Sequence, residues 1–486
     1  FVGLNPLHAL FTAEPERASP FAPSDRAFLN PLIIAVDAVP GYTPALLGGR
    51  AVPGAQECVD YARVGPLKLA VLADVFDRWA TAASPEDMAD HQRFVAERGE
   101  ALQSFATFEA LSHTMAAAGH GAGTRAWPAD IATRTAPGAQ AFASRHPRAV
   151  AFHVWLQYVA DRQLANAQAS ARRAGMRIGL YLDLAVGTAP DGHATWCAPD
   201  LSLTGLTIGA PPDLFSTEGQ SWGLAPMSPA ALAAADYAPF RAVLAAVMRH
   251  AGAVRIDHAM GLERLWLVPD GDSAKAGAYV RQPRLVDEVI DATHRHGTLA
   301  IGEDLGIVPP GFRERMDACR LFSMRIMMFE RDGHRFRAPG RYPVDALACL
   351  STHDFAPLEA WWDGDDLAIR EALGTLSSAN AAAERADRHR TKTGLLGLMG
   401  LPPGPASGPL DDRIRVAYHR AVARTPCRVM SVRLEDVVGG RRLVNLPGTD
   451  REHPNWRRTL PLDVEGILAS PVLRQVLDVV RQARTR

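Results

Sequence analysis

The chain has few cysteines, no long apolar run and no excess of either charge, and each shortage excludes a class of protein. The 52 basic and 53 acidic residues leave no electrostatic footprint for a nucleic acid or an anionic membrane surface. No apolar run approaches the roughly 18 residues that predict a membrane span. The five cysteines are odd in number, scattered and never spaced as CxxC, which argues against a disulfide framework or a zinc knuckle. They are Cys58, Cys197, Cys319, Cys349 and Cys427. We therefore expect a soluble protein of a reducing compartment, the cytoplasm, whose function depends on a local site.

Repeated helix–strand units are the main structural signal. Three stretches share a helix end rich in basic residues and glycine, a short β-rich run and then an acid: ARRAGMRIGLYLD, MRHAGAVRIDH and HRHGTLAIGED. Arg and His suit the negative end of a helix dipole. Gly175, Gly252 and Gly297 suit the left-handed residue that follows a helix. Each stretch is therefore predicted to lead from a helix into a buried strand.

Seven strands are predicted in all. One lies in each of the three stretches, and the others lie at residues 1–7, 321–329, 346–354 and 427–436. Two of the preceding helices have an apolar face that can cover a sheet. One face consists of Phe240, Val243, Leu244, Val247 and Met248, and the other of Leu285, Val286, Val289 and Ile290.

Strands separated by helices imply a parallel sheet, either an open doubly wound sheet or a closed barrel. The pattern alone hardly separates the two. Several different strands end in ionisable or polar groups, in YLD, RIDH, GED and STHD. This favours an α/β fold of the TIM (β/α)8 type, in which every strand end faces one site. Residues 1–486 are then one catalytic barrel, and the helical segments 51–150 and 363–425 are insertions into it.

Three carboxylates, Asp257, Glu303 and Asp354, follow predicted strands. Taken alone, each acid is better explained as a helix N-cap or as half of an ion pair than as a catalytic group. Together they would crowd like charges into one cavity, a cost that proteins accept mainly where the chemistry needs it. Retaining glycoside transfer needs such a set, with a carboxylate nucleophile and a protonated acid about 5.5 Å apart.

The surroundings of two of these acids suit different roles. Arg255 lies two residues before Asp257, so on a strand both side chains share one face, and the cation favours an ionised nucleophile. Glu303 follows the apolar run TLAIG and has no basic neighbour on its own strand. Burial should therefore raise the pKa of Glu303 and keep it protonated as the acid.

Seven stretches, in order along the chain, resemble the 4-α-glucanotransferase or amylomaltase family, glycoside hydrolase family 77 of the α-amylase clan. They are LNPLHALF, SPFAPSDRAFLN, GAPPDLFSTEGQSWGLAP, RIDHAMGLERLWLVP, AIGEDLGIVPPGFRERM, LSTHD and LVNLPGTDREHPNWRR. The resemblance spans Phe1 to about Arg458.

The resemblance implies a role for each candidate residue. Asp257 is the nucleophile, Glu303 the acid/base, and Asp354 the third acid, which holds sugar hydroxyls. Arg255 orients the nucleophile, and His258 and His353 bond the sugar beside it. Asp183 corresponds to the acid of the clan's first motif, and Trp222 would stack on a glucose ring.

The chain departs from the family pattern in two places. Phe21 stands where the family usually has Tyr, so stacking on a sugar is kept while a hydroxyl hydrogen bond is lost. In the family a first strand and helix precede the segment that matches FVGLNPLHALF. We therefore expect the first strand and helix of the barrel to be missing here, which fits a chain that opens on Phe1 rather than Met.

Several other motifs carry less weight. GQSWG fits a nucleophile elbow around Ser221, but that motif needs a strand before it and a helix directly after it. GHGAG is not a full dinucleotide fingerprint. His294 and His296 lie two apart on a predicted helix and are expected to be surface or capping residues. Of Trp361 and Trp362, at least one is expected in the core rather than on a sugar platform.

Three functions fit these residues. The first is a retaining α-1,4-glucan transferase with maltodextrin as donor and acceptor, and the second is an α-amylase-type hydrolase with the same acids. Only the family resemblance favours transfer over hydrolysis. The third, a non-catalytic glucan-binding barrel, predicts the loss of one of the three acids, and all three are present. No metal or organic cofactor is expected, because two carboxylates suffice and no ligand-spaced cluster occurs. The sequence does not indicate an oligomeric state.

Overall fold

The computed structural model describes residues 1–54, 56–213, 218–402, 406, 408–449 and 451–485. The chain divides into two units, each with its own internal contacts. The first comprises Phe1–Gly54 and Asp60–Phe312, and the second comprises Ala55–Val59 and Arg313–Arg486.

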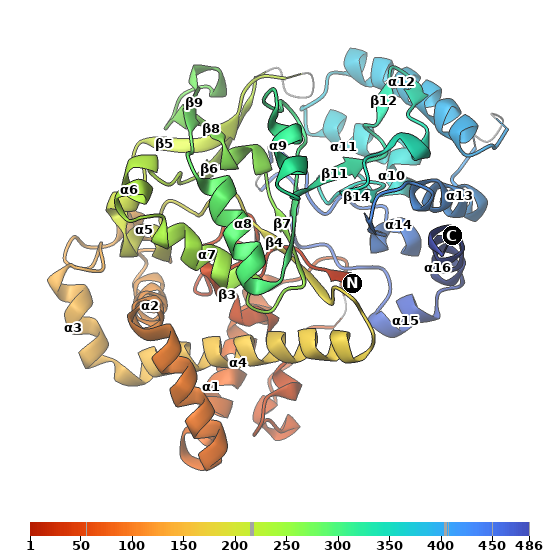
Figure 1. The fold of residues 1–486 in the computed structure, drawn as a ribbon. Coiled ribbons are helices and arrows are strands. Elements are labelled where there is room, and N and C mark those ends of the chain that lie inside the picture. The colour runs from red at the N-terminus through yellow and green to blue at the C-terminus, as the bar shows by residue number, and fades with distance from the viewer. Residues whose placement is uncertain (55, 214–217, 403–405, 407, 450, 486) are drawn as a thin grey trace. The chain divides into compact units, whose positions relative to one another are not determined.

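Four parallel strands form the centre of the first unit. Their order is β1 (Val2–Gly3), β4 (Leu180–Leu184), β7 (Ala253–Ile256) and β10 (Leu299–Gly302). Helices α4 (Pro147–Arg173), α7 (Ala238–Met248) and α8 (Leu285–His296) pack against these strands (Figure 1). The buried residues of α7 are the five that the sequence pattern predicts. The face of α8 is narrower than predicted, because Leu285 and Val289 are buried while Val286 and Ile290 are only half-buried.

The glycines before these strands serve two different purposes. Gly175 and Gly297 have the predicted left-handed backbone, with φ of 88° and 62°. The prediction for Gly252 is wrong, because its φ is not positive. A Cβ atom at Gly252 would instead lie 1.7 Å from the carbonyl oxygen of Ile178, so glycine is needed here for the close approach of two backbones.

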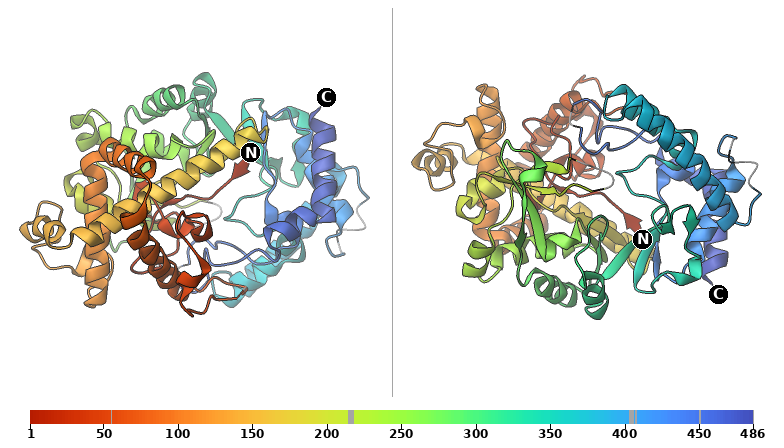
Figure 2. Two further views of the ribbon diagram at one scale, coloured as in Figure 1. Left: turned by 90° about the horizontal axis from the view of Figure 1, so that it is seen from below. Right: turned by 90° about the horizontal axis from the view of Figure 1, so that it is seen from above.

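The segment 51–150 is helical, as predicted. It contains α1 (Tyr61–Ala82), α2 (Pro85–Ala117), α3 (Pro137–Arg145) and the start of α4. The long helix α4 packs against α2 (Figure 2). Their shared core is rich in fully buried aromatic rings, among them Phe94, Phe105, Phe108 and Trp155.

Two antiparallel sheets in the first unit lie outside the predicted pattern. One is a hairpin of β2 (His8–Ala9) and β3 (Asp25–Leu29). The other has the order β6 (Gln220–Leu224), β5 (Leu206–Ala210), β8 (Arg264–Pro269) and β9 (Ala278–Arg281). Ser221 lies within β6, and the next helix, α6, begins only at Pro229. The expectation that GQSWG is not a nucleophile elbow is therefore confirmed.

Three further parallel strands lie in the second unit, in the order β11 (Phe322–Ile326), β14 (Ala346–Cys349) and β15 (Val429–Met430). All seven predicted strands are thus present as parallel strands. A short hairpin joins β12 (Arg331–Asp332) to β13 (Arg335–Phe336). The helices described from Phe312 onward are α9 (Phe312–Ala318), α10 (Leu358–Asp363), α11 (Asp365–Ala372), α12 (Ser378–Leu398), α13 (Asp412–Ala423), α14 (Leu434–Val438), α15 (Val464–Ala469) and α16 (Pro471–Arg484).

The expectation that at least one of the two neighbouring tryptophans lies in the core is confirmed, since Trp362 is fully buried and Trp361 is only partly buried. The expectation for His294 and His296 is confirmed too, because both fall in the last turn of α8, where His294 is exposed. Across the described parts of the chain, every helix is too short or too polar to cross a membrane.

Candidate active site

The register of the first sheet brings two acids to the same level. Ile256 at the end of β7 pairs with Leu184 of β4 on one side and with Gly302 of β10 on the other. The residues that follow these strand ends, Asp257 and Glu303, therefore lie at the same edge of the sheet. Their backbones stay tied to the neighbouring strands, because Asp257 N–H donates to Leu184 O and Glu303 N–H donates to Ile256 O, both at 3.0 Å.

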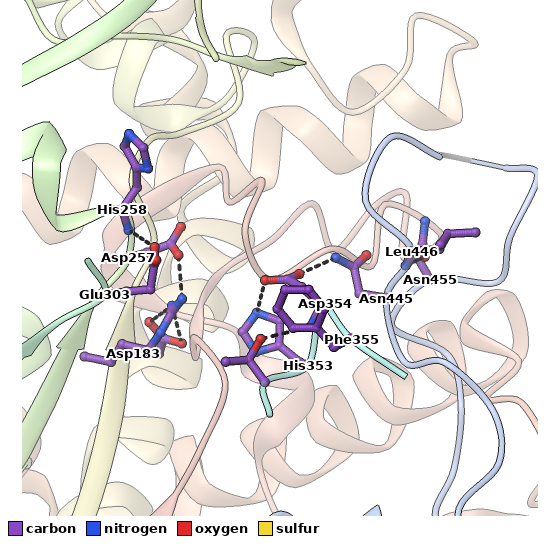
Figure 3. A network of polar contacts seen from close by, with 12 residues as sticks. Asp183, Asp257, His258, Glu303, His353, Asp354, Phe355, Asn445, Leu446 and Asn455 are labelled. Atoms are coloured by element: carbon purple, nitrogen blue, oxygen red, sulfur yellow. Dashed lines mark hydrogen bonds and ion pairs between the residues drawn. The ribbon is translucent and has the colours of Figure 1, made fainter. Parts of the chain in front are cut away.

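Arg255 joins the carboxylates of Asp183 and Asp257, both of which are labelled in Figure 3. Its Nη1 donates to Oδ1 and Oδ2 of Asp183 at 2.9 and 3.0 Å, and its Nη2 lies 2.9 Å from Oδ1 of Asp257. Burial disfavours the charge on Arg255, but Asp183, Asp257 and Glu303 outweigh burial and raise the pKa of Arg255 well above its ordinary value. A permanent cation is therefore fixed next to Asp257.

Glu303 has a different environment. It is 8% exposed, and each of its oxygens accepts a backbone N–H: Oε2 from His258 at 3.0 Å and Oε1 from Leu305 at 2.8 Å. Burial, with a smaller contribution from the charge of Asp257, raises the pKa of Glu303, and the net value is about 7. Arg255 and the two amides oppose this rise without cancelling it. Near neutral pH a large fraction of Glu303 therefore carries a proton.

His258 and two aromatic residues complete this group. His258 has a left-handed backbone, with φ of 46°, which turns the chain directly after Asp257. Burial lowers the pKa of His258, so its ring is neutral near pH 7. The ring lies edge-on to Trp222 of β6 at a centroid distance of 5.1 Å. The guanidinium of Arg255 lies 5.9 Å from the ring centre of Phe21.

The structure thus brings together, within the first unit, seven of the nine residues that the sequence singles out. They are Phe21, Asp183, Trp222, Arg255, Asp257, His258 and Glu303.

The other two, His353 and Asp354, follow β14 in the second unit. Oδ1 of Asp354 accepts a hydrogen bond from Asn445 Nδ2 at 2.8 Å, and Oδ2 lies 3.4 Å from His353 Nε2 (Figure 3). The His353 ring packs against Trp456 with centroids 5.1 Å apart. Both oxygens of Asp354 are therefore oriented by neighbouring side chains.

Arg433 was missed by the sequence reasoning. Its Nη1 donates to the carbonyl oxygens of Thr352 at 2.7 Å and Phe355 at 2.9 Å. These two carbonyls flank His353 and Asp354 in the chain, and the Arg433 side chain is only 10% exposed. Arg433 therefore holds both ends of the turn that carries Asp354. No local pattern marks it, because its partners lie 81 and 78 residues away.

Asn445 was also missed, although it lies in the quoted stretch LVNLPGTDREHPNWRR. A second asparagine from that stretch, Asn455, accepts the N–H of Leu446 at 2.8 Å and so fixes the backbone beside Asn445. The only signal available was the stretch itself, since the partner of Asn445 lies 91 residues away.

No group of three or more His, Cys, Asp or Glu side chains suited to a metal ion occurs among the described residues.

Comparison with protein families places these residues in a known context. The family model described as 4-alpha-glucanotransferase, glycoside hydrolase family 77, matches residues 1–463. The chain belongs to the 4-alpha-glucanotransferase family. Its family and its relatives identify it as an enzyme of the glycosyltransferase type with 4-alpha-glucanotransferase activity.

Relatives of this family match the whole chain. A 4-alpha-glucanotransferase from Mycobacterium tuberculosis is 36% identical over 523 residues, covering 100% of this chain and 70% of the relative. One from Haemophilus influenzae is 32% identical over 513 residues, covering 100% of this chain and 73% of the relative.

Solved amylomaltase structures share the fold. The crystal structure of amylomaltase from Corynebacterium glutamicum superposes with a TM-score of 0.84 at 29% identity, covering 98% of this chain and 69% of that one. Amylomaltase from Streptococcus agalactiae, solved in complex with acarbose, gives a TM-score of 0.80 at 18% identity, covering 99% of this chain and 91% of that one. With the parallel strands described above, these likenesses confirm an α/β fold of the TIM type.

Proposed function

We propose that this 4-alpha-glucanotransferase moves α-1,4-glucan segments between maltodextrins by double displacement. In the first step a carboxylate oxygen of Asp257 attacks the anomeric carbon, the bond to the leaving glucan breaks, and Glu303 gives its proton to the leaving oxygen. In the second step Glu303 takes the proton of an acceptor hydroxyl, which attacks the same carbon and releases Asp257. Each step inverts the anomeric centre, so the product retains the configuration.

The observation that carries this proposal is the difference between the two carboxyl environments. Arg255 contacts Asp257 at 2.9 Å, which favours the charged nucleophile. Burial holds the pKa of Glu303 at about 7, which keeps a proton available for the leaving group. An acid beside a fixed cation and a second acid that keeps a proton near neutral pH are what the nucleophile and the general acid require.

The remaining residues receive roles in glucan binding. We assign Trp222 to stacking on a glucose ring, and Phe21 to stacking without the hydroxyl that a tyrosine would offer. We assign His258, His353 and Asp354 to hydrogen bonds with sugar hydroxyls, following the family resemblance. Asp183 acts through Arg255, because it fixes the guanidinium that contacts Asp257.

We further propose that segments 51–150 and 363–425 are insertions into a single catalytic barrel, and that the reaction uses no metal or organic cofactor. A cytoplasmic location is proposed because all five cysteines are free thiols. The comparisons favour transfer over an α-amylase-type hydrolysis.

Two measurements test the proposal. Incubation with maltotriose should give longer maltodextrins plus glucose, whereas hydrolysis would give shorter sugars with matching growth in reducing ends. A Glu303→Gln variant given a maltotriosyl fluoride should accumulate a glycosyl ester, because fluoride leaves without a proton while the second step lacks its base.

The ester should be found by peptide mass spectrometry on the peptide that contains Asp257. The matched control is the double variant Glu303→Gln with Asp257→Asn, which should carry no sugar. An ester on another residue, or none at all with fluoride released, would contradict the assignment of Asp257.

A further inference from the structure

A second cluster of ionisable and nucleophilic side chains lies between β3, α2 and the short helix α5 (His193–Cys197) in the first unit. Nδ1 of His193 lies 2.7 Å from Oδ2 of Asp25, and Nε2 lies 3.2 Å from Oγ of Ser104. The Ser104 hydroxyl also contacts Sγ of Cys197 at 3.4 Å. The Ser104 hydroxyl therefore lies between the His193 imidazole and the Cys197 sulfur and contacts both. A carboxylate, an imidazole and a thiol are therefore connected in sequence.

Of the four residues in this cluster, Cys197 is the most exposed. Asp25, Ser104 and His193 are buried, at 7%, 8% and 3% exposed, whereas Cys197 is partly exposed. A small reagent that enters from the solvent therefore reaches the cluster at Cys197.

Aromatic rings shield the imidazole. Those of Phe28, Phe105, Phe108 and Trp196 surround His193 with centroid distances of 5.3 to 6.0 Å. In such surroundings an ion pair is weakly screened, so the charge of Asp25 acts strongly on His193.

The electrostatics favour a thiolate–imidazolium pair. Burial alone would lower the pKa of His193, but hydrogen bonds with Asp25 and Cys197 and the charge of Asp25 raise it to about 9. Burial alone would raise the pKa of Cys197. The hydrogen bond and charge of His193, a hydrogen bond from Ser104 and a weaker attraction to Arg134 lower it below its ordinary value.

We propose that Cys197 is a modification site, a thiol that hydroperoxides oxidise to sulfenic acid with His193 as the proton donor. The thiolate sulfur attacks one peroxide oxygen, so that an S–O bond forms and the O–O bond breaks. Sulfur loses two electrons and the peroxide gains them. The His193 imidazolium gives its proton to the departing oxygen, which leaves hydrogen peroxide as water. The glucan transfer reaction uses none of these groups.

The other cysteines provide internal comparators. Cys58 and Cys319 are also partly exposed, and Cys58 lies 3.3 Å from the guanidinium of Arg458. Cys58 thus has a neighbouring cation, but among the described residues no histidine forms a hydrogen bond with it. If a nearby positive charge were sufficient, Cys58 would react as fast as Cys197.

The experiment treats the intact enzyme with hydrogen peroxide near pH 7, traps sulfenic acid with dimedone and quantifies each cysteine peptide by mass spectrometry. We expect Cys197 to be labelled at least about tenfold faster than Cys58 and Cys319, because the thiolate is the reactive form. Equal or slower labelling of Cys197 in the unmodified chain overturns the proposal without any variant.

A variant then tests the role of the pair. Asp25→Asn keeps an acceptor for the His193 ring but removes the charge that holds its proton. The Cys197 labelling rate should fall at least about tenfold while Cys319 is unaffected. An unchanged Cys197 rate in the folded variant would show that the pair does not activate the thiol. Ser104→Ala is the milder substitution if Asp25→Asn does not fold, and it should slow Cys197 alone.

Discussion

Replacing Glu303 by glutamine should stabilise the protein at alkaline pH while removing its activity. The pKa of Glu303 is raised from 4.5 to about 7 in the folded protein, chiefly by burial. Between these two values the folded chain holds a proton that the unfolded chain has released. Stability therefore falls as pH rises through this window and is constant above it. The glutamine variant has no such group, so it escapes the loss.

The size of the effect follows from the shift. Each pKa unit corresponds to about 1.4 kcal/mol, so the full shift costs the folded state on the order of 3 kcal/mol. Because part of the loss has already occurred at about pH 5, the change between about pH 5 and about pH 8.5 is roughly 2.5 kcal/mol. The assay is urea unfolding of both proteins at these two pH values. Contributions from titrating groups that do not interact with Glu303 cancel in the difference between them.

Glu109 provides a matched control in the same unit. It is 2% exposed, burial raises its pKa from 4.5 to about 7, and its Oε2 accepts a hydrogen bond from Thr12. Glu109→Gln should therefore show a similar pH-dependent gain in stability with activity retained. Parallel pH profiles for the original protein and Glu303→Gln would refute the reasoning, because Glu303 would then titrate normally in the folded state.

Three further results are expected. Asp257→Asn should lower turnover by several orders of magnitude with an unchanged circular dichroism spectrum, since an amide cannot form the glycosyl ester; residual activity above about a tenth would rule out Asp257 as nucleophile. Arg433→Met should lower kcat about tenfold or more with a smaller change in KM, because two charge-assisted hydrogen bonds to the Asp354 turn are lost. Arg433→Lys should restore part of kcat, and a folded Arg433→Met enzyme with normal kcat would show that the turn needs no such support. Exhaustive chelation should leave maltotriose disproportionation unchanged, whereas a loss reversed by added metal would reveal a required ion.

The parts of the fold that the sequence predicts are those governed by local periodicity. A helix that ends in glycine and leads to an apolar run is a local pattern, and the three strands predicted from it, β4, β7 and β10, are present as parallel strands. The antiparallel sheet that carries Trp222 was missed, because its strands are short and lie between turns without clear alternation. Gly252 was assigned the wrong purpose, since the constraint on it comes from the carbonyl of Ile178 on another segment.

In the site, too, the sequence predicts contacts between residues close together in the chain but not contacts between distant ones. Arg255 and Asp257 could be paired from sequence because they lie two residues apart on one strand. Arg433 could not, since its hydrogen bonds are to backbone carbonyls, which every residue has and no side-chain pattern marks. His193 and Asp25 are 168 residues apart, so only the folded chain reveals that they form a pair.

The two backbone amides that bond Glu303 also decide the direction in which its proton can point. Each carboxyl oxygen has two lone pairs, and the N–H groups of His258 and Leu305 occupy one on each oxygen. A proton on Glu303 must use one of the two lone pairs that remain, one on each oxygen. In a double displacement the Glu303 carboxyl acts first as an acid and then as a base. Because both of its oxygens are hydrogen-bonded, the carboxyl group does not rotate between the two steps. Under the proposed mechanism, the main chain therefore limits the proton that Glu303 exchanges with the glucan to two positions, one on each oxygen.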